Sequence, residues 1–94
     1  VWARNPVIQA IQAKGRLYCP HYLGAGVGLL ASGHLLAAAG GGGMLEIDSN
    51  PNPLRSQLAG ALNAIQNGAA ALSDEPGLGV PVHLDRQVKV ALAD

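Results

Sequence analysis

The sequence predicts an α/β fold in which helices alternate with short strands along the first half of the chain. Its segments follow the order helix, strand, helix, strand, which favours parallel strands joined by helical crossovers. Of the 94 residues, 49% are apolar, and the apolar residues are mostly Ala, Leu, Val and Ile. This composition suits close packing of helices on strands. The length corresponds to one small domain or to part of a larger one.

The first helix is expected to begin at Asn5-Pro6, because Asn is a good N-cap and Pro suits the first helical turn. Gly15 fits the position just after this helix. The run Arg16–Pro20 then indicates a short buried strand, and His21 stands at its end.

A glycine-containing loop at 24–26 leads into a second predicted helix, Val27–Ala39, which is apolar on nearly all sides and should be covered on most faces. Four glycines, 40–43, end this helix. Met44–Asp48 is the second predicted strand, and Glu46 and Asp48 share one of its faces.

The second half of the chain has a different pattern. Residues 50–53 (Asn-Pro-Asn-Pro) predict a rigid turn, and Leu54–Ala59 can form one or two helical turns. Ala59–Ser73 is compatible with a helix, but Asn67-Gly68 favours a hairpin between Leu62–Gln66 and Ala69–Leu72.

The remaining residues are assigned as a loop followed by two elements. Asp74–Gly79 predicts the loop, and Val80–His83 an extended segment. Asp85 can cap a last helix that continues through Ala93.

Charge and cysteine content exclude several classes of protein. Six basic and six acidic residues give a net charge of zero, so nothing electrostatic favours nucleic acid or an anionic membrane surface. Tyr22–Leu45 carries no formal charge, but its glycine run argues against a transmembrane helix. The single Cys19 excludes an internal disulfide framework and indicates a reducing compartment. The chain starts at Val1 without a methionine, which we interpret as a fragment's end.

One possible binding motif is the glycine loop Gly24-x-Gly26-x-Gly28, which lies between a strand and a helix as in dinucleotide-binding proteins. Glu46 lies 20 residues after Gly26, where an acidic residue would meet a ribose. The pattern fails at Leu29, where the dinucleotide motif has its third glycine.

A metal site is a second possibility, with candidate ligands at His21, His34, Glu46, Asp48 and His83. No two of them have the i, i+4 spacing of ligands on one helix. His34 lies within an apolar helix, where a hydrogen-bonded core histidine is the more common role. His83 lies in a polar stretch and is expected at the surface.

The third possibility combines His21 and Glu46, at the carboxyl ends of neighbouring parallel strands, where barrel enzymes place catalytic groups. Histidine can transfer protons near neutral pH, and a protonated Glu could donate a hydrogen bond to an anionic intermediate. The residue types alone fit equally well with two polar side chains that have no catalytic role.

Three segments, in this order, resemble the mandelate racemase and muconate lactonizing enzyme family of the enolase superfamily. Residues 19–38 resemble its seventh barrel strand and helix, and residues 44–48 with 50–55 resemble its eighth strand and the following loop. Residues 76–80 (PGLGV) are similar to a segment near the family's C-terminus. Together they cover most of residues 16–85.

The resemblance implies the C-terminal portion of a (β/α)7β barrel, too short to close a barrel alone. Residues 1–60 would form the last barrel units, and residues 61–94 a hairpin and helix returning toward the capping domain. It implies a Mg²⁺-dependent dehydratase or racemase that removes the proton α to the carboxylate of an acid sugar, giving an enediolate. Members with a catalytic His are favoured over members with a Lys on the sixth strand.

For this chain, the resemblance assigns His21 as the general acid/base and Glu46 as the group that hydrogen-bonds the substrate carboxylate. It assigns substrate binding to Tyr22 and Gly24. The family's Mg²⁺ ligands lie on earlier strands, so the ion's ligands would lie outside this chain, which would be inactive alone. We expect a cytoplasmic protein that forms a homo-oligomer or associates with the missing part of the barrel.

Two alternatives stay open. One is a small module that binds a nucleotide phosphate through the Gly24–Gly28 loop. The other is a non-catalytic assembly piece whose apolar faces bind another chain.

Overall fold

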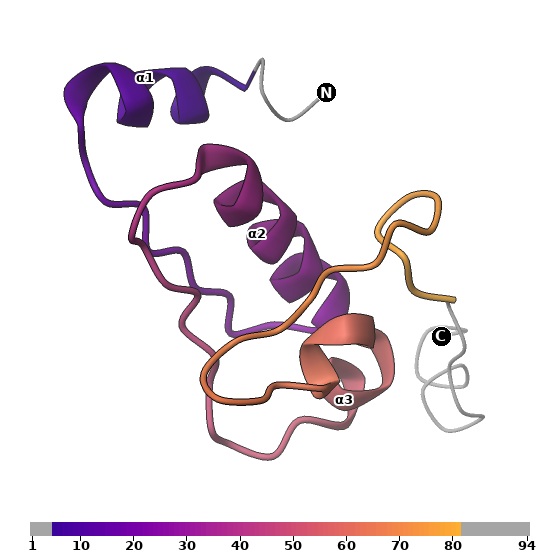
Figure 1. Cartoon of the computed structure of the whole chain (residues 1–94). Helices are drawn as coiled ribbons and strands as arrows, with labels where there is room; N and C mark the ends of the chain where they lie inside the picture. The colour runs from indigo at the N-terminus through magenta and orange to yellow at the C-terminus, as the bar shows by residue number, and fades with distance from the viewer. Residues whose placement is uncertain (1–4, 82–94) are drawn as a thin grey trace, which may run out of the picture.

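The computed structural model describes residues 5–81, and Figure 1 shows their arrangement. Helix α2 runs through the middle of the molecule, and two extended stretches of chain, before and after it, pass along one of its sides. The helical elements are α1 (Pro6–Lys14), α2 (Gly26–Ala39), α3 (Pro53–Leu58) and the 3₁₀ helix η2 (Gly60–Asn63).

Helix α1 begins and ends as the sequence predicts. The Asn5 side chain accepts a hydrogen bond from the Val7 N–H at 2.9 Å, and Pro6 occupies the first turn. Gly15 follows the helix in the left-handed conformation, with φ of 59°. Ile8 is fully buried, and the Gln12 side chain donates to the Ala39 carbonyl, so α1 is fastened to the end of α2.

Helix α2 is the predicted apolar helix, and it starts one residue earlier than expected, at Gly26. Val27 and Ala37 are its exposed residues, and the others are buried or half-buried. The helix is therefore covered on most faces, as predicted. The helix ends at the glycine run, where Gly40 has φ of 68°.

The two predicted strands lie parallel, but within residues 5–81 they pair at one bridge, His21 with Glu46. The Glu46 N–H donates to the Pro20 carbonyl at 2.9 Å. The prediction that Arg16–Pro20 is a buried strand is wrong for most of its length, since Leu17 is 72% exposed and Cys19 is exposed too. Among the described residues, no element buries Leu17 or Cys19.

The Asn-Pro-Asn-Pro segment forms the predicted turn and leads into α3, where Pro53 occupies the first turn. Asn67 and Gly68 have positive φ values, 53° and 73°, and join Gln66 to Ala69 in an antiparallel bridge, so the hairpin turn is confirmed. The long arms predicted on either side of this turn are not confirmed, because the described residues pair there at the single bridge Gln66–Ala69.

The predicted arm that starts at Leu62 is wrong, because Leu62 belongs to the 3₁₀ helix η2. Its side chain is 8% exposed and packs in the core with Leu29, Leu30 and Ala59. Burial against α2 therefore overrides the local preference for an extended arm.

The core lies between α2 and the segments that follow it. Six partly buried side chains pack on its central cluster: Leu45, Ile47, Ala70, Leu72, Leu78 and Val80. In the described part of the chain, no helix has the length and apolarity needed to cross a membrane. Residues 74–79 form the predicted loop, with a turn at 77–78. His83 and the predicted helix from Asp85 lie outside the described residues.

Candidate functional site

His21 and Glu46 are direct partners in the parallel pairing of the two extended stretches. Neighbouring strands lie about 4.8 Å apart, and the side chains of paired residues stand on the same face. Both residues are exposed. An imidazole and a carboxyl group therefore stand next to each other on an open face.

This register depends on a close approach of the two backbones three residues before the pair, at Tyr18 and Gly43. A Cβ atom at Gly43 would overlap the carbonyl group of Tyr18. A residue with a side chain would push the two stretches apart at this point, so the glycine helps to keep His21 beside Glu46.

Tyr22 and Gly24, the predicted substrate-binding residues, lie in the exposed loop directly after His21. The Tyr22 ring is 45% exposed and covers both Gly24 and Gly28, where a Cβ atom would overlap the ring. Gly26 lies against the backbone of Leu58 and Ala59. Each glycine of the loop thus has a packing role that requires no bound phosphate.

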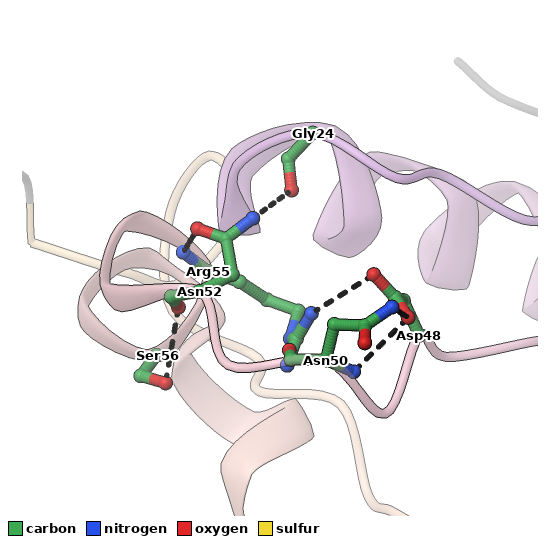
Figure 2. A network of polar contacts seen from close by, with 6 residues as sticks. All are labelled: Gly24, Asp48, Asn50, Asn52, Arg55 and Ser56. Carbon is green, nitrogen blue, oxygen red and sulfur yellow. Dashed lines mark hydrogen bonds and ion pairs between the residues drawn. The ribbon is translucent and has the colours of Figure 1, made fainter.

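The loop after Glu46 is held by a network of polar side chains, shown in Figure 2. Asp48 accepts hydrogen bonds from the backbone N–H of Asn50 at 3.0 Å and from its side-chain amide at 2.8 Å. The Arg55 guanidinium donates to the Asn50 carbonyl at 2.6 Å and pairs with Asp48 at 3.9 Å. Asp48, predicted to share a face with Glu46, therefore has its oxygens engaged within this loop.

Asn52 belongs to the same network and reaches the other strand-end loop. Its Oδ1 atom accepts from the Arg55 N–H at 3.1 Å and so caps α3. Its Nδ2 atom donates to the Gly24 carbonyl at 3.3 Å, across the gap between the two loops (Figure 2). The pattern of residues 50–53 predicts a turn, and its Asn52-Pro53 pair is also the signal of a helix cap that could have identified this residue.

The other predicted ligands do not gather at the site. In the stretch 5–81, no three His, Cys, Asp or Glu side chains lie close enough to hold a metal ion together. His34 is half-buried in α2, and its Nε2 atom lies 3.4 Å from the Leu78 carbonyl oxygen. His34 is therefore hydrogen-bonded within the fold, as expected, but it is half-buried and does not belong to the core cluster.

An apolar cavity of about 310 Å³ opens on the opposite side of the Met44–Asp48 segment. Leu45 and Ile47 line it, and because side chains alternate along an extended chain, Glu46 faces the other way. Helix α2 and the hairpin turn supply most of its other lining residues, among them Leu36, Ile65 and Leu72. The cavity is therefore separate from the His21–Glu46 pair.

The comparisons with known proteins agree with this geometry. Residues 5–87 match the family model described as enolase C-terminal domain-like. The structure of a mandelate racemase/muconate lactonizing enzyme from Bordetella bronchiseptica RB50 superposes with a TM-score of 0.78 and 48% sequence identity. The alignment covers 95% of this chain and 24% of that chain. No curated protein matches.

The family match extends over most of the chain, and the structural match covers nearly all of it. The described residues supply helices and two extended segments of such a barrel, without closing one. The chain belongs to the mandelate racemase and muconate lactonizing enzyme family of the enolase superfamily.

Proposed function

We propose that this chain supplies two catalytic side chains, His21 and Glu46, to an enzyme that removes the proton α to a carboxylate. The observation that carries the proposal is their direct pairing across the two extended segments, on an exposed face. The family membership supports an enzymatic role for the whole protein. The chain spans 24% of the matched structure, so the reaction is proposed for a protein that contains more of the barrel.

The chemistry follows from what each side chain can do. The His21 imidazole would accept the α-proton, and the electron pair left behind would delocalise onto the carboxylate oxygens as an enediolate. A protonated Glu46 would donate a hydrogen bond to one of these oxygens. Because negative charge grows there as the proton leaves, this hydrogen bond would strengthen in the transition state and raise kcat.

Delivery of a proton to the opposite face of the enediolate, by an acid from another part of the enzyme, would give racemisation. Transfer of the proton held by His21 to a β-hydroxyl, which then leaves as water, would give dehydration. We propose an acid sugar as the substrate, since it carries both the carboxylate and the β-hydroxyl. Tyr22 and Gly24, in the exposed loop next to His21, would contact it.

Mg²⁺ would add charge neutralisation at the substrate carboxylate. The described residues bring no three metal-binding side chains together, so they do not form a site for the ion by themselves. We propose that its ligands come from other parts of the enzyme.

What covers the exposed residues near the His21–Glu46 pair, and where the protein is located, are also proposals. Leu17 and Met44, on the two extended segments that carry His21 and Glu46, are 72% and 76% exposed. We propose that the rest of a barrel, or a second copy of this chain, covers them. The free thiol of Cys19 fits a reducing, cytoplasmic location.

The experiment is hydrogen exchange at the α-carbon of gluconate, galactonate and glucarate in D₂O with Mg²⁺, followed by NMR with the protein that carries this chain. We expect exchange with one of these acids and its loss in His21→Asn. His34→Asn is the matched control, since His34 is bonded to the Leu78 carbonyl, and it should retain exchange. Unchanged exchange in His21→Asn would refute the assignment of the base.

A further inference from the structure

The loop after His21 and the loop after Glu46 are fastened together by one side chain. Asn52 donates from Nδ2 to the Gly24 carbonyl, three residues beyond His21. Asp48, two residues beyond Glu46, is held to the same turn through Asn50 and Arg55. A short chain of polar contacts therefore runs from one strand end to the other, as Figure 2 shows.

The two ends of the Asn52 amide have separate tasks. Its oxygen caps α3 by accepting from the Arg55 N–H, whereas its nitrogen reaches the Gly24 loop, 28 positions earlier in the sequence. Capping needs only an oxygen acceptor, which Asp supplies as well as Asn. The bond to Gly24 needs a donor, which Asp lacks when ionised.

Burial contributes little to holding the Gly24 loop. Residues 21–24 are all exposed, and Leu23 is 63% exposed. Exposed loop residues with few packing contacts open easily, so polar contacts have a large share in fixing their position.

We propose that Asn52 is a positioning residue for the His21–Glu46 pair: its Nδ2–H fixes the Gly24 loop against the turn before α3. The inference rests on the proposed function for its effect on catalysis. Asn52 itself does not touch the reacting atoms. Its influence passes through the backbone between Gly24 and His21, and a misplacement of a catalytic group by about 1 Å can reduce a rate by about a hundredfold.

The test compares Asn52→Asp with Asn63→Asp in the protein that carries this chain. Asn63 is a matched control, because its side-chain amide also donates to a carbonyl, that of Ser56, at 2.7 Å on the exposed surface. Both substitutions remove one amide donor and add one negative charge. Within residues 5–81, the Asn63 side chain bonds to the end of α3 and to neither strand-end loop.

Two readouts separate positioning from stability. Hydrogen exchange followed by mass spectrometry should show faster exchange in residues 22–28 of Asn52→Asp, with α3 unchanged because its cap is kept. With the acid sugar that the wild type converts fastest, kcat should fall about tenfold and KM should change less. Asn63→Asp should match the wild type in both readouts.

Unchanged exchange in residues 22–28, or equal kinetic losses in the two variants, would overturn the proposal. Failure of the proposed function looks different. If the wild type converts none of gluconate, galactonate and glucarate, the catalytic assignment falls, while the exchange data still decide whether Asn52 holds the Gly24 loop.

Discussion

His21 and Glu46 are far apart in the sequence, and their pairing depends on the register of two extended segments. The sequence could predict both residues at strand ends, because each follows a short apolar run before a turn. It could predict that they are neighbours, because the helix between them implies a parallel crossover. The exact register also depends on the close approach of Gly43 to Tyr18, which no local sequence pattern predicts.

Asn52 shows the limit of prediction for a single residue. Its cap on α3 is local and follows from the Asn-Pro pattern, but its bond to the Gly24 carbonyl joins residues 28 positions apart. Contacts of this kind depend on how two loops meet after folding. Arg55 is a similar case, since its pairing with Asp48 requires the turn at 50–53 to fold back.

The substitution Glu46→Gln tests the proposed role of the Glu46 side chain. The amide is a weaker acid, so it matches the charge that develops in the transition state less well, although it still binds the ground-state carboxylate. We expect kcat to fall between about tenfold and a hundredfold, with a smaller change in KM. Steady-state kinetics of α-proton exchange would measure both.

Glu75→Gln is the control for this change, because Glu75 lies in an exposed loop and its backbone N–H bonds to Ser73. It should leave both constants unchanged. A loss confined to KM in Glu46→Gln would identify Glu46 as a ground-state binding residue with no special role in the transition state.

The helices were more predictable than the strands. Local signals define both long helices: the Asn5 cap and Gly15 bound α1, and an apolar run that ends at Gly40 forms α2. The predicted strands depend on neighbours, and within residues 5–81 each has one partner, so they form a single bridge. Residues 60–63 became a 3₁₀ helix because Leu62 packs in the core, which depends on the tertiary fold.

The contact between α2 and α3 depends on the absence of a side chain at Gly26. A Cβ atom there would overlap the backbone of Leu58 and Ala59 and would lie 2.6 Å from the Arg55 carbonyl oxygen. Backbone atoms cannot move aside cheaply, so we expect Gly26→Ala to lower the free energy of unfolding by about 1–3 kcal/mol. Urea denaturation of the purified protein would measure this change.

Gly42→Ala is the matched control. A Cβ atom there would lie 3.8 Å from the Leu17 side chain, which is ordinary van der Waals contact. Its free energy of unfolding should stay within about 0.5 kcal/mol of the wild type. Equal stability of Gly26→Ala and Gly42→Ala would show that α3 does not pack as closely on α2 as described.

For the whole molecule, the two faces of the extended segments have different surroundings. One face packs on the apolar core through Leu45 and Ile47, while the open face carries the exposed His21–Glu46 pair. The sequence pattern predicts a shared face for Glu46 and Asp48, but it does not predict the exposure of Leu17. The chain spans 24% of the matched structure, so what covers the open face is a proposal.

The central claim is that the open face at the ends of these segments binds the substrate carboxylate. The most direct measurement is a crystal structure of the protein that carries this chain, with Mg²⁺ and an acid-sugar hydroxamate, which imitates the enediolate. We predict ligand oxygens within hydrogen-bonding distance, about 3 Å, of Glu46, with the His21 imidazole beside the carbon that carries the α-proton. A hydroxamate bound instead in the apolar cavity beside Leu45 and Ile47, or on the Gly24–Gly28 loop away from both side chains, would contradict the claim.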